Sequence, residues 1–452
     1  MSSDVAGSLA PLLRQLLGAD LPWRLRGWDG STSGPADAPA TIVLRSKRAL
    51  RTLLWQPDEL GLARAYVAGD LDIEGDIYAA LDSPELIEQV AGNEGLGLTR
   101  AQKVQALATL VRLGAVGRRP ELPVEEIVRT RRAARLRHDE ASDAAAISHH
   151  YDVGNDFYRL VLGPSMVYSC AYWAQQPSAS YGLDDAQRDK LDVVCRKLDL
   201  RPGQRLLDVG CGWGSLVLHA AQEYGVRAVG ITLSVEQAAL ATERVAAAGL
   251  ADRVEIRVQD YREIPDGPYD AISSVGMAEH VGAEQLGTYA AALRAAISPG
   301  GRLLQHAIAS PADPADSHEE QRSSFIDRYV FPDGEVEPLG ATVTALDRAG
   351  FEIRDVENLR EHYALTLRRW VANLEEHWAE AVAATSEGRA RVWRLYMVGS
   401  ALGFQTGEIT INQTLAVARV RGGHSGMPLT REGLLPRENV PAAVPPDVRV
   451  TQ

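Results

Sequence analysis

The chain has little cysteine, no long apolar run and no excess of positive charge. It contains three cysteines among 452 residues, a low and odd count that argues against a disulfide framework and fits a reducing compartment. No stretch reaches the roughly 18 uninterrupted apolar residues that a membrane-spanning helix needs. The formal net charge of −13 argues against a general nucleic-acid-binding protein.

The start of the chain also lacks the pattern of a secretory signal, because no basic stretch precedes an apolar core. We therefore expect a cytoplasmic protein whose contacts with lipid are peripheral. The hydrophobic fraction of 45% and the charged fraction of 24% are those of an ordinary globular chain. Its length is enough for roughly two or three domains.

The chain is organised around a glycine-rich turn. The apolar run Arg205–Val209 predicts a buried parallel strand, and the segment from Leu216 onward predicts a helix. Between them stand three glycines at alternate positions: Gly210, Gly212 and Gly214. Glycines in a strand–turn–helix unit let the backbone approach a nucleotide-like ligand without a Cβ in the way. This unit predicts the start of a doubly wound α/β domain.

The second expected strand lacks the acidic residue of a dinucleotide-binding fold. Such folds place Asp or Glu about 20 residues after the glycines, on the ribose hydroxyls. Here the strand that ends at Ile231 is followed by Thr232, Leu233 and Ser234. The Gly-x-Gly-x-Gly spacing also differs from the Gly-x-Gly-x-x-Gly of that fold. Both observations argue against NAD and favour a fold of the S-adenosylmethionine (SAM) methyltransferase kind.

Strands and helices alternate through the rest of this region. We expect helices at 183–198 and 234–248, and strands at 226–231, 254–258, 269–275 and 301–308. This alternation predicts an α/β fold with a doubly wound, mostly parallel sheet of the Rossmann-like type, covered by helices on both faces.

Composition divides the chain into four parts. Residues 1–95 are expected to form a small α+β domain and residues 96–145 a helical, basic connector. Residues 146–421 are expected to form the catalytic domain and residues 422–452 a loosely packed tail. The expected elements of the first part are helices at 9–17, 60–67 and 77–81 and strands at 23–26 and 40–44.

Residues 69–75 hold closely spaced acids between turn glycines. A calcium loop requires a fixed spacing of oxygen ligands that this segment lacks. We therefore expect a surface turn there.

Residues 129–137 hold five arginines in nine positions. They form either the solvated face of a helix or a patch that meets lipid phosphates. In an acidic chain, such a local patch would orient the molecule on a membrane.

Several long motifs carry a family resemblance that covers roughly residues 147 to 420. They resemble those of the cyclopropane fatty acid synthases and the related mycolic acid methyltransferases, which use SAM to modify double bonds of acyl chains. The first 95 residues resemble the additional N-terminal domain of the phospholipid-modifying branch, which implies association with lipid. The motifs are His150–Tyr158, Ser165–Trp173, Leu207–Gly214, Gly230–Gln237, Val275–Gly282, Phe325–Gly334 and Tyr396.

The resemblance implies a set of SAM-binding residues. Those expected along SAM are Tyr168, Ser169, Gly210 and Gly212. Those expected at the ribose and adjoining groups are Thr232, Leu233 and Gln237, and those expected beside the adenine are Asp260 and Tyr261.

The resemblance also implies a bicarbonate ion beside the reacting methyl group. The matching positions are Cys170, Glu279, His306, Ile308 (through its backbone) and Tyr396. Taken alone, Cys170 and Tyr396 would be typical of packing, and His306 of a core histidine. No metal site is expected, because His280 beside Glu279 has no second histidine at metalloprotease spacing.

Two positions depart from the family pattern, namely Ala278 before the Glu-His pair and Gly399-Ser400 after the tyrosine. If they line the acyl pocket, they alter its shape and put the product in doubt more than the chemistry.

The implied chemistry is attack of an alkene on the sulfonium methyl, which leaves a carbocation on the acyl chain. A dry pocket and negative charge near the cation favour this step. Loss of a proton from the added methyl closes a cyclopropane ring, whereas loss from a neighbouring carbon leaves a methylene branch. The alternatives are a small-molecule N- or O-methyltransferase and a silent lipid-binding protein. The mostly apolar segment from Tyr396 to Phe404 argues against a polar acceptor pocket.

The expected partners are unsaturated acyl chains of phospholipids at the membrane surface, with no nucleic acid. The resemblance also allows a homodimer. The expected location is the cytoplasm, at the inner face of the membrane.

Overall fold

The computed structural model describes residues 4–17, 20–82, 100–127, 153–311, 325–332 and 334–434. The arginine-rich stretch 129–137 and the end of the tail, 435–452, lie outside the described residues. The same holds for the first three residues of the motif that begins at His150.

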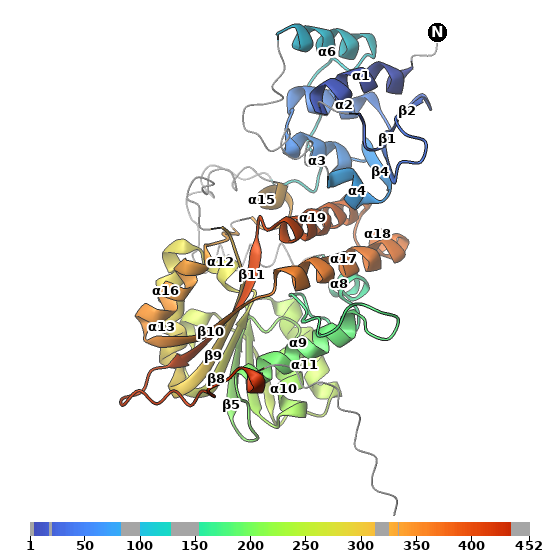
Figure 1. The fold of residues 1–452 in the computed structure, drawn as a ribbon. Coiled ribbons are helices and arrows are strands. Elements are labelled where there is room, and N and C mark those ends of the chain that lie inside the picture. Colours follow the sequence, from blue (N-terminus) through green and yellow to red (C-terminus); the bar gives the residue numbers. More distant parts are fainter. Residues whose placement is uncertain are drawn as a thin grey trace, which may run out of the picture.

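The larger part of the chain is built on a seven-stranded sheet (Figure 1). Its strands are β5 (Arg205–Val209), β6 (Arg227–Thr232), β7 (Val254–Val258), β8 (Tyr269–Val275), β9 (Ile297–Ala309), β10 (Phe351–Asn358) and β11 (Thr410–Ala418). They lie in the order β10-β11-β9-β8-β5-β6-β7. The run from β9 to β7 is parallel, whereas β11 is antiparallel to both of its neighbours. The predicted α/β fold with a mostly parallel sheet is thereby confirmed.

Helices cover both faces of this sheet. Consecutive residues of a strand point to opposite faces, and on β5 Leu206 packs into one core while Leu207 packs into another. The helices are α8 (Asn155–Leu162), α9 (Leu183–Lys197), α10 (Ser215–Glu223), α11 (Val235–Ala247), α12 (Ala278–Val281), α13 (Leu286–Ala296), α15 (Phe325–Tyr329), α16 (Leu339–Ala349), α17 (Arg360–Glu376), α18 (Trp378–Ala384) and α19 (Glu387–Thr406). Short 3₁₀ turns are η2 (Tyr261–Glu263), η3 (Ala283–Gln285) and η4 (Glu432–Leu434).

The N-terminal part has its own four-stranded sheet, in the order β2-β1-β3-β4. Its elements are α1 (Val5–Leu17), β1 (Arg24–Arg26), β2 (Thr32–Ser33), β3 (Ala40–Leu44), α2 (Lys47–Trp55), α3 (Glu59–Val67), β4 (Leu71–Gly75), α4 (Ile77–Leu81) and α6 (Arg100–Arg112). The expected helices and strands are present, and the structure adds α2, β2 and β4.

The prediction of a surface turn at residues 69–75 was wrong. Residues 71–75 form β4, which is antiparallel to β3 and pairs Ile73 with Ile42. Leu71 and Ile73 are buried, while the acids Asp72 and Glu74 alternate with them. The alternation of apolar and acidic residues has the period of a strand, and it outweighs the turn-forming tendency of the flanking glycines.

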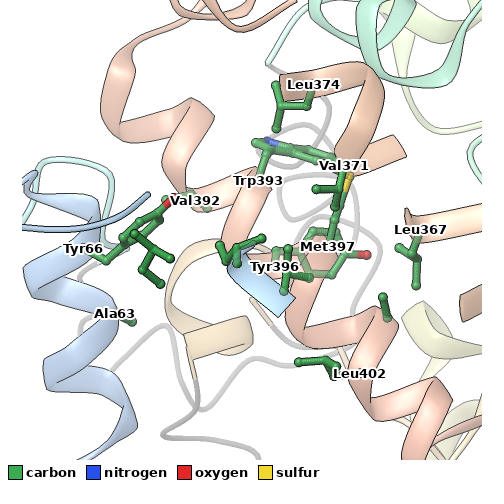
Figure 2. Packing of buried hydrophobic residues seen from close by; sticks show 14 of the residues in the cluster. Ala63, Tyr66, Leu367, Val371, Leu374, Val392, Trp393, Tyr396, Met397 and Leu402 are labelled. Atoms are coloured by element: carbon green, nitrogen blue, oxygen red, sulfur yellow. The ribbon is translucent and has the colours of Figure 1, made fainter. Parts of the chain in front are cut away.

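Helix α19 joins the two parts through buried arginines. Arg391 donates to both carboxylate oxygens of Asp72 on β4, at 3.2 Å each. Arg394 donates to the hydroxyl of Tyr66 on α3 at 3.0 Å. Figure 2 shows Tyr66 beside Val392, with the side chains of α17 and α19 meeting in the same core. The two parts therefore share one continuous hydrophobic cluster.

A second buried ion pair also connects the N-terminal part with the larger part. The guanidinium of Arg64 on α3 donates to both oxygens of Glu126, at 2.7 and 2.6 Å, and the hydroxyl of Tyr329 donates to the same carboxylate at 3.0 Å. The Glu126 side chain is 0% exposed and that of Arg64 is 8% exposed. The pair ties α3 to the segment after α6 and to α15.

We expect Glu126→Gln to lower the free energy of unfolding by about 3 kcal/mol, because removal of one partner leaves a buried charge uncompensated. Urea denaturation followed by circular dichroism measures this. Glu121→Gln, at an exposed position close in sequence, is the matched control and should change stability by less than about 0.5 kcal/mol. Equal midpoints for the two variants would contradict the prediction.

Candidate functional site

The glycine-rich turn lies at the carboxyl end of β5. The backbone amides of Gly210 and Cys211 both donate to the carbonyl of Ile231 at 2.9 Å, which holds the turn against the tip of β6. Gly210 has a φ of +80°, and a Cβ there would lie 2.5 Å from Cγ of Met277. The turn therefore requires glycine for both backbone conformation and space.

A cavity of about 960 Å³, including its open mouth, lies over this turn. Loops after β5, β6 and β8 form its wall together with residues 166–169. Ligands of open α/β sheets bind at this edge, outside the carboxyl ends of the strands. The predicted SAM-binding residues that line the cavity are Tyr168, Ser169, Gly210, Gly212, Thr232, Leu233, Gln237 and Tyr261.

Asp260, which was expected beside the adenine, is placed differently. Its side chain is absent from the cavity wall. Its carboxylate accepts from the backbone amide of Arg262 at 2.7 Å and pairs with the Arg262 guanidinium at 2.7 and 2.8 Å. Asp260 therefore caps the 3₁₀ turn η2 and holds the neighbouring Tyr261 at the wall.

Hydrogen bonds among neighbouring residues hold the tip of β6. The Thr232 hydroxyl donates to Oε1 of Gln237 at 2.8 Å and accepts from the backbone amide of Ser234 at 3.2 Å. The Ser234 hydroxyl caps α11 by accepting from the Gln237 amide. The polar groups at this end of the cavity are thus held by one another.

Sequence reasoning missed two buried charged residues in the cavity wall, Lys190 and Asp208. The Lys190 ammonium donates to the Ser169 hydroxyl at 3.0 Å, and the Ser273 hydroxyl donates to Asp208 at 2.7 Å. Burial lowers the pKa of Lys190 to about 8 and raises the pKa of Asp208 to about 6. A cation and an anion in one wall can bind the carboxylate and ammonium groups of an amino acid. The available signal was a lysine in the apolar stripe of α9, between Ala186 and Val194.

Glu279 lies on α12, at the end of β8. Its Oε1 accepts from the backbone amide of Ile308 at 2.8 Å, while its Oε2 is buried and has no hydrogen-bond partner within the described part of the chain. Burial raises the pKa of this carboxyl to about 7. Ile308, whose backbone the resemblance implies at a bound ion, thus orients the carboxylate through its amide.

His306 and Cys170 are fully buried. His306 is two residues before Ile308 on β9, so both side chains lie on one face of the sheet. Its Nδ1 lies 3.5 Å from Nε2 of Gln413, and its Nε2 has no partner. Burial, with the positive charge of Lys190, lowers the pKa of His306 well below its usual value, which keeps the imidazole neutral.

Burial also raises the pKa of the Cys170 thiol well above its usual value, so the sulfur stays protonated. The sulfur lies 3.2 Å from the Ala171 carbonyl and 3.8 Å from the Leu359 carbonyl. Among the described residues, no hydrogen bond joins Cys170 to Glu279, His306 or Tyr396. Cys170 is therefore unsuited to act as a nucleophile.

Tyr396 contacts a residue of the cavity wall. The hydroxyls of Tyr396 on α19 and Tyr168 in the cavity wall lie 3.3 Å apart. The Phe331 ring lies 5.7 Å from the Tyr396 ring and 5.8 Å from the His280 ring. Figure 2 shows Tyr396 among apolar side chains of α17 and α19. Aromatic rings thus keep this region dry.

The residues of the cluster fit a small bound anion. Among the described residues, Glu279 Oε2 and His306 Nε2 are buried polar atoms without a hydrogen-bond partner, and both belong to the expected set. Such atoms cost free energy unless a ligand or water satisfies them. A hydrogen-bond acceptor and a ring nitrogen are groups that suit bicarbonate, which carries both a proton and acceptor oxygens.

Two negative findings apply to the described residues. No group of three or more metal-ligating side chains gathers there. No helix among them combines the length and the hydropathy needed to cross a bilayer.

Comparison with known proteins decides the family. The sequence profile of the family described as mycolic acid cyclopropane synthetase matches residues 138–414. This chain belongs to that family. The predicted resemblance is confirmed, and the chain is a SAM-dependent methyltransferase of the cyclopropane synthase family.

Relatives from two organisms match nearly the whole chain. A probable fatty acid methyltransferase from Mycobacterium tuberculosis is 41% identical over 90% of this chain and 94% of its own length. One from Pseudomonas putida is 40% identical over 94% of this chain and 99% of its own length. These alignments include most of the N-terminal part.

The solved structures match the catalytic part of this family member. The mycolic acid cyclopropane synthase CmaA1, solved with S-adenosylhomocysteine, is 32% identical with a TM-score of 0.57. The match covers 61% of this chain and 98% of that one. The bound product of SAM in that relative supports SAM as the methyl donor here.

Proposed function

We propose that the protein transfers the SAM methyl group to the cis double bond of an unsaturated acyl chain in a membrane phospholipid and closes a cyclopropane ring. The observation that carries the proposal is the Glu279 carboxylate, with one oxygen fixed by the Ile308 amide and the other buried without a partner. It lies beside the SAM cavity and offers negative charge where a cation would form.

The reaction balances without an external oxidant. The alkene attacks the methyl carbon, the carbon–sulfur bond breaks, and S-adenosylhomocysteine leaves with the bonding electron pair. The resulting carbocation loses a proton from the added methyl, and the electrons of that C–H bond close the ring. Bicarbonate, when bound, supplies the base that takes this proton.

The residues of the chain serve this reaction in distinct ways. Glu279 Oε2 would accept a hydrogen bond from the hydroxyl group of bicarbonate and so orient it, and the buried His306 would contribute a neutral imidazole. The contact between the Tyr168 and Tyr396 hydroxyls supports a position of Tyr396 next to the donor cavity. Trp370 and Trp393, whose rings lie 5.3 and 5.8 Å from that of Tyr168, help to exclude water that would quench a cation.

A methylene-branched product, the precursor of a methyl branch, is the second candidate, and the names of the relatives favour it. Two relatives are probable fatty acid methyltransferases. Another, the tuberculostearic acid methyltransferase UfaA1 of Mycobacterium tuberculosis, is 32% identical over 90% of this chain. Proton loss from a neighbouring carbon would leave a methylene branch, the precursor of a methyl branch.

Proton nuclear magnetic resonance of lipids from cells that express the protein tests the proposal. Both products add one carbon and two hydrogens to the acyl chain, so their masses agree. Ring protons resonate at high field, and the two protons of an exocyclic methylene resonate apart from the internal vinylic protons of unmodified chains. Ring signals support the proposal, exocyclic methylene signals support the second candidate, and internal vinylic signals alone in cells with active protein contradict both.

The rate should depend on the charge of Glu279. Burial raises the pKa of Glu279 to about 7. Below that pH the carboxyl group is protonated, so it carries no negative charge and is a poorer hydrogen-bond acceptor. We expect kcat at saturating SAM and constant bicarbonate concentration to fall as the pH drops through about 7. Release of S-adenosylhomocysteine measures this. A fall centred near 4.5, the ordinary value for Glu, would contradict the role.

The cellular setting belongs to the same proposal. We place the protein in the cytoplasm, attached peripherally to the inner face of the membrane. Docking through the arginines of 129–137 stays a prediction, because that stretch lies outside the described residues. The homodimer also stays a prediction.

A further inference from the structure

Two segments of the N-terminal part carry positive charge and no negative charge. Residues 45–56 contain four lysines and arginines, residues 100–120 contain five, and neither segment contains an Asp or Glu. The whole chain has a net charge of −13. Two purely cationic segments in an acidic chain require an explanation beyond average composition.

The fold brings these segments together. The Trp55 indole nitrogen on α2 donates to the Gly117 carbonyl at 3.0 Å. The Arg51 guanidinium donates to the Ala115 carbonyl at 3.2 Å. The chain after α6 therefore packs on α2, and Figure 1 shows α6 at the end of the molecule farthest from the seven-stranded sheet. We call the exposed side chains of α2 and of residues 104–119 the α2–α6 surface.

Large apolar side chains are exposed on the same surface. Val104, Leu107 and Val111 recur at the helical spacing of one face of α6. On α2, both Leu54 and Trp55 are exposed at the last turn. The exposed fractions are Leu54 36%, Trp55 53%, Val104 69%, Leu107 48%, Val111 58% and Val116 45%. Several exposed large apolar side chains on adjoining elements are typical of an interaction site.

Most of the cations are available to a partner. Within the described part of the chain, Lys47, Arg112, Arg118 and Arg119 form no ion pair. Arg48 pairs with Asp70 at 3.2 Å and also donates to the Glu121 carbonyl. Arginine stems pack on apolar surface while their charged ends stay in a polar layer. The surface thus offers apolar groups and charged groups at once.

We propose that the α2–α6 surface docks the protein on an anionic lipid bilayer. Basic residues around exposed aliphatic side chains and one tryptophan match the two layers of a membrane interface, phosphates outside and acyl chains beneath. The proposal rests on the proposed function, which requires an acyl chain that resides in a bilayer.

Charge favours a bilayer over two other partners. A second copy bound about a twofold axis would bring this surface against itself, and like charges would meet without a carboxylate from these segments. Nucleic acid would be repelled at long range by the acidic chain, and it offers nothing for the exposed aliphatic side chains. Both partners are distinguishable outcomes of the test.

The position of the surface sets its role. The SAM cavity lies at the carboxyl ends of the strands, whereas α6 lies beyond α1 and α2 at the far end of the N-terminal part (Figure 1). The surface therefore attaches the protein to its substrate layer and takes no part in the chemistry. Loss of docking should spare turnover of lipid that is dispersed in detergent.

The test compares three variants of the full chain in vesicle co-sedimentation. The first replaces Arg112, Arg118 and Arg119 by Ser. The second combines Leu107→Ser with Val111→Ser. The control replaces three exposed arginines at the opposite end of the larger sheet, Arg201, Arg227 and Arg253, by Ser. The vesicles contain phosphatidylglycerol with phosphatidylcholine, or phosphatidylcholine alone.

We expect the first variant to lose about 100-fold in partitioning to anionic vesicles, because each cation near such a surface contributes about a factor of five. The second should lose about tenfold, and the control should bind as the unaltered protein does. All should retain turnover with detergent-dispersed phospholipid. Binding of the first variant at the unaltered level overturns the proposal.

The remaining outcomes are also decisive. Equal loss on neutral vesicles would refute the charge mechanism. If sedimentation shows that the first variant breaks an oligomer, or if an oligonucleotide displaces the unaltered protein from vesicles, the surface serves another partner. Intact docking without turnover of dispersed lipid would instead contradict the proposed function and leave the docking surface standing.

Discussion

Glu279→Gln should reduce turnover by about 10²- to 10⁴-fold, the usual contribution of a positioned acid–base group. Glutamine is isosteric and its oxygen can still accept from the Ile308 amide, so the local fold is retained. It lacks the negative charge and turns the unpartnered Oε2 position into a donor. A base held at that position would then be misoriented, and the cation would lose its stabilisation.

The measurement pairs release of S-adenosylhomocysteine with calorimetric SAM binding. Turnover should fall by the factor given above. The SAM affinity should change less than about threefold, because Glu279 is outside the cavity wall. Glu284→Gln, at an exposed position on η3, is the matched control and should behave as the unaltered protein. Turnover within about threefold of normal in Glu279→Gln would remove this carboxylate from the mechanism.

Gly210→Ala should weaken SAM binding by tenfold or more. The backbone at Gly210 has a φ of +80°, which costs an L-residue roughly 1–2 kcal/mol. A Cβ there would lie 2.5 Å from Cγ of Met277, which itself lines the cavity. The methionine must move, and the turn must distort. Since about 1.4 kcal/mol is a factor of ten in affinity, strain and displacement together account for the loss.

Gly203→Ala is the control variant. It introduces a similar backbone strain but no steric clash, so it separates the effect of strain from the effect of the displaced Met277 side chain. Gly203 has a φ of +85°, but nothing lies within 4 Å of a Cβ built there. The control variant should be destabilised to a similar degree in urea and should bind SAM normally in calorimetry. If both variants bind SAM equally well, the contact between Gly210 and Met277 has no part in forming the cavity.

Local sequence patterns predicted much of the catalytic fold. Residues 254–258 and 269–275 form strands at their expected bounds because apolar residues and turn signals delimit both segments. Helix α11 begins where Ser234 caps it and ends before Gly249, as the sequence indicates. These features depend on residues that are near neighbours along the chain.

The parts that were missed depend on contacts between distant residues. Lys190 reads as a surface lysine until the structure shows Ser169 and the cavity beside it. The Tyr168–Tyr396 contact joins positions 228 residues apart. The family resemblance identified both tyrosines as site residues but did not indicate that their hydroxyl groups are in contact. The same holds for Ile308: the resemblance implied its backbone at a bound ion but did not indicate that its amide donates to Glu279.

The contact between α19 and the N-terminal part has a consequence for the evolution of the family. Cyclopropane mycolic acid synthase 1 of Mycobacterium tuberculosis aligns over 95% of its own length but only 60% of this chain. In this chain, Arg391 and Arg394 are buried, and each has partners in both parts: Arg391 binds Glu387 and Asp72, and Arg394 binds Glu375 and Tyr66. A relative that loses the front part would leave each guanidinium group with its carboxylate on the catalytic part alone. Gain or loss of that part should therefore coincide with substitution at these two positions, which are five and two residues before Tyr396 on the same helix.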